Sequence, residues 1–174
     1  MVRHTFGVLV ENHFGVLSRV SGLFSRRGFN IESLAVGPTA DPSMSRMTIV
    51  IEGNERMRDQ MVEQLRKLID VIQVEALATD AMVDRELALI KVKADRVTRA
   101  AVMQVVDVFR GQVVDVSRDS LMVEITGDGR KINALLEVLD DYGVLEVART
   151  GTVAIGRGRE SLGPLEDVSE VSGS

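Results

Sequence analysis

The chain has 174 residues, of which 45% are hydrophobic, 27% charged and 3% aromatic, enough for one large domain or two small ones. A net charge of −5 and the absence of Trp argue against a nucleic-acid partner. The absence of Cys excludes disulfides, Cys–zinc sites and thiol nucleophiles, and it fits a reducing compartment. Because no apolar run reaches the roughly 18 residues of a membrane span and no signal-peptide core is present, we expect a cytoplasmic protein with no membrane partner.

The first half of the chain predicts a strand, a helix, two strands, a helix and a strand. The opening run is apolar on both faces, as in a central strand, and the next apolar residues recur at helical spacing up to Gly28, which stops the helix. A loop with two prolines separates the middle strands. The predicted ranges are 5–10, 16–27, 31–36, 47–51, 55–70 and 71–78.

The second half predicts the same order of elements, over 86–94, 101–109, 112–116, 121–125, 132–139 and 145–155. A repeated β-α-β-β-α-β pattern gives an α+β protein with two tandem ferredoxin-like units, each an antiparallel sheet with two helices on one face. We predict domains at 1–79 and 80–158, followed by an acidic tail, 159–174, that is disordered. Since each small unit leaves one sheet face bare, the other unit or a second copy of the chain is expected to cover it, which favours a homodimer.

Motifs for chemistry are absent from the sequence. It contains no P-loop, no dinucleotide fingerprint and no HExxH pattern. Of its two histidines, His4 is predicted to be a surface residue at the mouth of the first strand, and His13 to lie in a loop. With no Cys and no ordered carboxylate pair we expect no metal site. No nucleophile, base and orienting group can be assembled from local spacing, so we predict no catalytic residues and favour a binding protein.

One segment has the character of a binding site. Residues 11–17 form a turn that leads into a helix N-terminus, where free backbone N–H groups and the helix dipole favour a carboxylate. Gly15 permits close approach to the backbone, and Asn12 offers a donor and an acceptor, which suits an α-amino acid. A second turn, 28–31, lies at the other end of the same helix. It therefore reaches the same ligand only when two copies of the chain pair edge to edge.

A plainer explanation covers the same residues. Asn12 and Gly15 are also ordinary turn-formers, and residues 28–30 are also an ordinary helix stop. Physical chemistry alone leaves both explanations open.

Several motifs carry a family resemblance, which extends over about residues 2–158. The longest is Asn12-x-x-Gly15-Val16-Leu17-Ser18-Arg19-Val20 followed by Gly22-Leu23-Phe24-x-x-Arg27-Gly28-Phe29-Asn30-Ile31-x-Ser33-Leu34. It resembles the ACT domain of the small regulatory subunit of acetolactate synthase (acetohydroxyacid synthase). The shorter motifs that resemble the same family are Ser45-Arg46-Met47-Thr48, Phe109-Arg110-Gly111 before Val113-Val114-Asp115-Val116, and Glu146-Val147-Ala148-Arg149-Thr150-Gly151.

The resemblance implies a regulatory subunit of branched-chain amino-acid biosynthesis. In such subunits ACT domains pair, and valine binds at their interface as a feedback inhibitor. Carried over by motif, the effector-binding residues are Asn12, Gly15, Val16 and Leu17 of one chain and Asn30 and Ile31 of its partner. The subunit activates the catalytic (large) subunit, which would carry thiamine diphosphate, FAD and magnesium, and this chain would hold no cofactor and no metal.

Two rival functions stay open at this point. One is another amino-acid-sensing ACT regulator that does not associate with acetolactate synthase, which would need a DNA-binding or catalytic segment. The other is a small stand-alone enzyme of ferredoxin-like fold, which would need a convergent catalytic set. The sequence offers neither feature.

Overall fold

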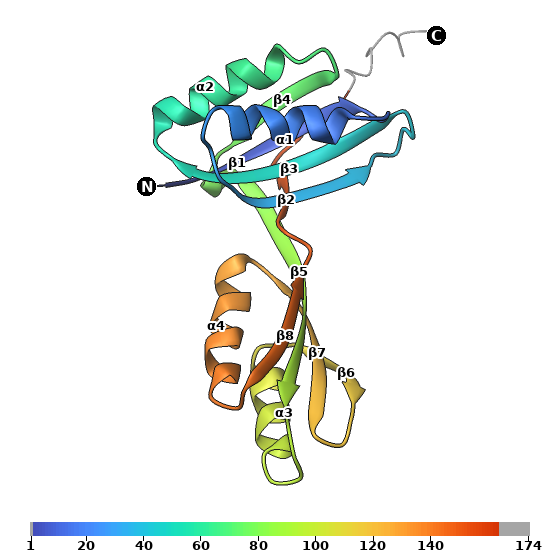
Figure 1. Cartoon of the computed structure of the whole chain (residues 1–174), viewed down its shortest axis with the longest axis vertical. Coiled ribbons are helices and arrows are strands. Elements are labelled where there is room, and N and C mark those ends of the chain that lie inside the picture. The colour runs from blue at the N-terminus through green and yellow to red at the C-terminus, as the bar shows by residue number, and fades with distance from the viewer. Residues whose placement is uncertain (1, 164–174) are drawn as a thin grey trace, which may run out of the picture.

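The computed structural model describes residues 2–163 and shows two α+β units one after the other (Figure 1). The first unit is an antiparallel sheet of strand order β2-β3-β1-β4, with α1 and α2 on one face. Its elements are β1 (Val2–Glu11), α1 (Val16–Arg26), β2 (Ile31–Pro38), β3 (Met44–Gly53), α2 (Glu55–Arg66) and β4 (Val71–Leu77).

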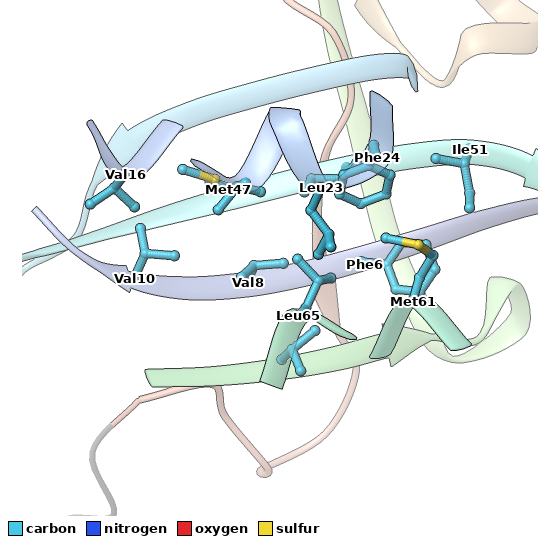
Figure 2. Packing of buried hydrophobic residues seen from close by; sticks show 13 residues of the cluster. Phe6, Val8, Val10, Val16, Leu23, Phe24, Met47, Ile51, Met61 and Leu65 are labelled. Carbon is cyan, nitrogen blue, oxygen red and sulfur yellow. The ribbon is translucent and has the colours of Figure 1, made fainter. Parts of the chain in front are cut away.

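The core of the first unit lies between its helices and its sheet. Alternate residues of β1, namely Phe6, Val8 and Val10, are buried toward the helices. Figure 2 shows Leu23 and Phe24 of α1 and Met61 and Leu65 of α2 packing down onto them. Each such side chain contributes about 1.5–3 kcal/mol when fully removed from water, so helix and strand periodicity together determine this layer.

The second unit repeats the arrangement, with a sheet of order β6-β7-β5-β8. Its core contains Ile90, Val123 and Leu135. The two units therefore confirm the predicted α+β class and the β-α-β-β-α-β order of each. The elements of the second unit are a short 3-10 helix η1 (Thr79–Ala81), β5 (Met82–Lys93), α3 (Arg99–Val108), β6 (Gln112–Val116), β7 (Ser120–Gly127), α4 (Gly129–Asp140), β8 (Val144–Arg149) and β9 (Val153–Gly156).

Three predicted boundaries were wrong. α2 ends at Arg66 and not at residue 70, because the backbone after it forms hydrogen bonds between residues three apart, such as Leu68 N to Leu65 O, in place of the α-helical spacing of four. β5 begins at Met82 and not at residue 86. The last strand region is broken at residues 150–152, where Gly151 has φ +80, and the broken piece, β9, pairs with the start of β5.

The prediction for His4 was also wrong, because this residue is only 6% exposed. It pairs with Ile51 across the strands, which puts it on the same sheet face as Phe6 and under the helices. Its Nε2 lies 3.2 Å from the carbonyl oxygen of Gly53, so the imidazole is satisfied inside the fold. Strand alternation, not nearness to the chain end, decides its burial.

The second face of the first sheet is the one that lacks helices. Thr5 and Gly7 of β1 lie on it, paired with Val50 and Thr48 of β3. Although no helix covers this face, Val50 is 1% exposed and Thr48 is 3% exposed. The segment that follows β8, here called the return segment (residues 150–163), covers it together with the start of β5. The red part of the chain in Figure 1 runs up from the second unit to the first.

The return segment is fixed to the sheet by polar contacts. Ser33 Oγ accepts a hydrogen bond from Thr152 N at 2.7 Å. The guanidinium of Arg46 donates to Ala154 O at 2.7 Å. Beside them, Leu77, Met82 and Ala154 form a small buried cluster that joins the units. The bare face is therefore covered in part by the same chain, as one of the two predicted alternatives stated.

The predicted disordered tail begins with contacts in this structure. Gly163 N donates to Gln73 Oε1 of β4 at 3.2 Å. A Cβ atom on Gly7 would lie 2.6 Å from Leu162 Cδ1, so the Leu162 side chain rests directly over this glycine. Residues 162 and 163 thus contact the first unit, the disorder of the tail stays a prediction, and residues 164–174 lie outside the described part of the chain.

Membrane-spanning helices were not predicted from the sequence. Across residues 2–163, none of the helices combines the length and the apolar character that a membrane span needs.

Replacing Gly151 with Ala should weaken the attachment between the units. Gly151 has φ +80, and a Cβ there would lie 3.0 Å from both Leu34 O and Ser33 Oγ. Gly158→Ala is the matched control, because its φ is +93 and nothing lies within 4 Å. We expect both variants to lose about 1–2 kcal/mol of unfolding free energy through backbone strain, and Gly151→Ala to lose roughly 1–3 kcal/mol more through overpacking. Urea unfolding measures both losses, and equal losses would contradict the close docking of this turn.

Candidate ligand site at the start of helix α1

The N-terminus of α1 has no side-chain cap. Its N-cap residue is Gly15, with φ +82, and the first turn contains no acidic residue. Two other helices differ, because the Asn54 side chain caps α2 by accepting from Met57 N and Asp128 caps α4 by accepting from Lys131 N, whereas α3, like α1, has no side-chain cap hydrogen bond. The first N–H groups of α1 are therefore free to bind an anion, and the helix dipole favours one there.

An ion-pair cluster supports the turn before α1. His13 Nε2 lies 2.9 Å from Glu11 Oε2 and 3.1 Å from Asp70 Oδ1. Arg19 Nε donates to the other oxygen of Asp70 at 2.5 Å. The hydrogen bond with Glu11 is the main cause that raises the pKa of His13 above its ordinary value, and the hydrogen bond from Arg19 is the main cause that lowers the pKa of Asp70. The turn is therefore held by charges from β1, from α1, from the turn before β4 and from His13 of the turn itself.

Three of these groups could in principle bind a metal ion. Glu11, His13 and Asp70 each offer a ligand atom within 4.8 Å of the others, so the sequence-based statement that no carboxylate pair forms here was wrong. The guanidinium of Arg19, however, already forms an ion pair with the Asp70 carboxylate. A divalent cation would have to lie beside this fixed positive charge, so the groups are better explained as an ion-pair cluster, and the absence of a metal site stays a prediction.

Asn12 is tied to the loop between β2 and β3. Its Nδ2 donates to Pro42 O at 3.0 Å, and its backbone N–H donates to Ser43 O at 2.8 Å. This explains part of its role as structural, in agreement with the plainer explanation given above. Its side-chain oxygen, to which no residue in 2–163 donates, can still accept from an ammonium group.

The remaining site residues of this turn differ in exposure. Gly15 is exposed, and a Cβ on it would lie 2.9 Å from Arg19 Nη1. Arg19 therefore places its positive charge beside the open helix N-terminus. Val16 is only 4% exposed and packs near Val10 (Figure 2), so only its backbone can face a ligand. Leu17 is 46% exposed and offers an apolar side chain.

Asn30 and Ile31 lie far from this turn within one chain. Both β1 and β2 are antiparallel to β3, so they run parallel to each other. The end of β1, with Asn12 after it, is thus at the same end of the sheet as Pro38, where β2 ends. Ile31, at the start of β2, lies at the opposite end of the sheet, as the sequence predicted.

Sequence reasoning missed Arg19 and Asp70 as parts of this site. Arg19 follows Gly15 by four residues and so lies on the same side of α1, a spacing that could have indicated it. Asp70 is separated from Arg19 by 51 positions, and no local pattern connects them. Only the pairing of β1 with β4 brings Asp70 to this turn.

The fold and the site define a class: a regulatory ACT-type domain, followed by a second ferredoxin-like unit. Two family models agree with these units, "AHAS small subunit-like ACT domain" over residues 6–73 and "Small subunit of acetolactate synthase" over 85–158.

Individual relatives match almost the whole chain. A probable acetolactate synthase small subunit of Archaeoglobus fulgidus is 50% identical over 91% of this chain and 99% of its own length. The acetolactate synthase small subunit of Mycolicibacterium smegmatis is 52% identical, over 92% and 94%. The crystal structure of the small subunit from Thermotoga maritima superposes with a TM-score of 0.85 at 39% identity, over 92% of this chain and 100% of that one. The chain belongs to the acetolactate synthase small-subunit family.

Removing the His13 imidazole should change how stability depends on pH. Its folded pKa lies above the ordinary 6.5, so folding favours the protonated form. The stability that His13 contributes is fully present below pH 6.5 and is lost as the pH rises through the raised folded pKa. We therefore expect His13→Gln to be less stable than the wild type at low pH, with a difference that shrinks as the pH rises.

Urea unfolding at a series of pH values measures that difference, and NMR titration of His13 gives its pKa directly. Glu11→Gln is the matched variant, since it removes the main cause of the raised pKa and should move the His13 titration toward lower pH. A His13 pKa that Glu11→Gln leaves unmoved would contradict this account of the cluster.

Proposed function

We propose that this chain is the non-catalytic regulatory subunit of acetolactate synthase, and that valine binds between the ACT domains of two copies. Bound there, valine inhibits the enzyme by feedback, whereas the valine-free subunit activates it. Asn12, Gly15, Val16 and Leu17 of one copy, with Asn30 and Ile31 of the other, form the effector site. The catalytic subunit supplies thiamine diphosphate, FAD and magnesium.

The open edge strand β2 carries this proposal. It is the outermost strand of the first sheet, paired only with β3 among the described residues. If two copies pair their β2 strands antiparallel about a two-fold axis, the partner's Ile31 comes to the end of the sheet where this chain has Pro38 and Asn12. The two half-sites, which are apart in one chain, then lie together at both ends of the shared strand pair.

The chemistry of the two halves suits an apolar α-amino acid. The uncapped N–H groups at Gly15–Val16, with the charge of Arg19 beside them, suit a carboxylate. The free oxygen of Asn12 suits an ammonium group. The half-exposed Leu17 and the partly buried Ile31 suit an aliphatic side chain. A ligand that contacts both copies shifts the subunit toward the arrangement that it binds best.

Mixing this chain with the catalytic subunit from the same organism tests the function directly. We expect the mixture to form acetolactate faster than the catalytic subunit alone, and valine to reverse the stimulation. The chain alone should form no acetolactate from pyruvate. A rate that neither the chain nor valine alters would refute the proposal.

Two substitutions test the effector residues. Gly15→Asp places a negative charge at the open helix N-terminus. Asn30→His places a larger side chain in the half-site on the other copy. Each should weaken valine inhibition by tenfold or more, about 1.4 kcal/mol, while stimulation persists. Gly158→Asp is the control, because it introduces the same residue at another positive φ in open space. If valine inhibits both site variants as it inhibits the control, the site lies elsewhere.

Pairing through β2 predicts which apolar residues hold the dimer. Leu17 of α1 is 46% exposed and Val36 of the edge strand β2 is 47% exposed, and we expect both to become buried on pairing. Leu17→Glu and Val36→Glu should raise the dimer dissociation constant by tenfold or more, because a carboxylate would be desolvated there. Val97→Glu is the control, as Val97 is 86% exposed but belongs to the second unit. Sedimentation at several concentrations measures all three, and dimers of equal strength would exclude this interface.

A further inference from the structure

A chain of hydrogen bonds runs from the edge strand β2 into the second unit. It begins at Ser33, which lies two residues after Ile31. Ser33 Oγ accepts a hydrogen bond from Thr152 N at 2.7 Å. The Thr152 hydroxyl in turn donates to Glu86 Oε1 at 3.2 Å. Residues of β2, the return segment and β5 are thus linked in two steps.

The chain continues from β5 to helix α4. The other oxygen of Glu86 accepts from Arg149 Nε at 2.8 Å and lies 2.7 Å from Arg149 Nη2. The remaining nitrogen, Arg149 Nη1, donates to Asn133 Oδ1 of α4 at 2.8 Å. Every contact from Ser33 to Asn133 is therefore within hydrogen-bond distance.

Burial gives the contacts of Thr152 with Glu86 their energetic weight, whereas the last link, from Arg149 to Asn133, is exposed. Thr152 is 3% exposed, and the Glu86 side chain is 5% exposed. A buried carboxylate without its partners is destabilised by several kcal/mol, so Glu86 constrains both Thr152 and Arg149 to stay with it. Hydrogen bonds in such surroundings are stronger than in water. A displacement of Ser33 cannot leave Glu86 and Arg149 in place without breaking one of these contacts.

The turn at Gly151 tightens the link further. A Cβ on this glycine would lie 3.0 Å from both Ser33 Oγ and Leu34 O, so the return segment lies directly against β2. Ser33, Glu86, Asn133 and Arg149 also line a pocket of about 420 Å³ between the units.

We infer that the chain Ser33–Thr152–Glu86–Arg149–Asn133 couples the effector half-site on β2 to helix α4 of the second unit. The inference rests on the proposed function, because it assigns the route by which valine at the ACT interface alters the rest of the subunit. Ser33 and Thr152 are positioning residues in this route. Neither belongs to the proposed effector residues, and both act through the residues to which they are hydrogen-bonded.

The decisive variants are Ser33→Ala, which removes the acceptor, and Thr152→Val, which removes the hydroxyl but keeps the branched shape. In the reconstituted complex both should stimulate acetolactate formation as the wild type does, and the isolated variants should still bind valine. The valine concentration for half inhibition should rise by about tenfold or more, within the range of ordinary allosteric coupling. Ser33→Thr, which restores a hydroxyl, should restore inhibition.

Ser25→Ala serves as the matched control. Among residues 2–163, its hydroxyl hydrogen-bonds only to Ser21 O of its own helix, at 3.3 Å. This variant should be inhibited by valine as the wild type is. If Ser33→Ala and Thr152→Val bind valine and are inhibited with unchanged sensitivity, the inference is overturned.

Hydrogen exchange separates failure of the route from failure of the proposed function. In the valine-free chain, Ser33→Ala should speed amide exchange in α4 (Gly129–Asp140), whereas Ser25→Ala should not. Unchanged α4 exchange in Ser33→Ala would overturn the route whether or not valine binds. If the wild-type chain binds no valine, the proposed function fails, and the exchange result still decides whether β2 and α4 are coupled.

Discussion

An antiparallel sheet has two faces, and the two helices of the first unit cover only one of them. The face that bears Val50 and Thr48 must be covered by something else, because leaving such residues in water sacrifices about 25 cal/mol for each Å² of apolar surface. The chain meets this constraint by breaking its last strand at Gly151 and sending β9 and residues up to 163 back over the first sheet. The two units are consequently linked by the return segment, which packs on the first sheet, as well as by β5.

That cover has a consequence for regulation. A connection through a single strand would let the second unit move independently of the ACT domain. The return segment instead hydrogen-bonds to β2 and β3 through Ser33 and Arg46, and β2 is the strand along which two copies are proposed to pair. A change at the proposed dimer edge would therefore act on a segment that contacts both units. Packed interfaces of this kind hold discrete arrangements and do not deform continuously.

The candidate site shows a division of labour between backbone and charge. The helix N-terminus at Gly15 offers N–H groups that no side chain satisfies. The ion pairs of His13 and Arg19 with Asp70 keep the preceding turn in one shape and place a guanidinium next to it. Under the proposed function, such a site would recognise the charged end of an amino acid with little selectivity. Preference for an aliphatic side chain would then have to come from Leu17 and from the second copy.

The sequence by itself determined the element order, the core faces and the turn at Asn12–Gly15, since these depend on periodicity and on the conformations that glycine and proline allow over a few residues. It also separated the two half-sites, because they lie at opposite ends of one helix. Only the tertiary structure decided the partners of His13, the partner of His4 and the break at Gly151. The reason is that Asp70, Gly53 and Ser33 are distant in the sequence and are brought there by strand register. Contacts that depend on register leave no local pattern to read.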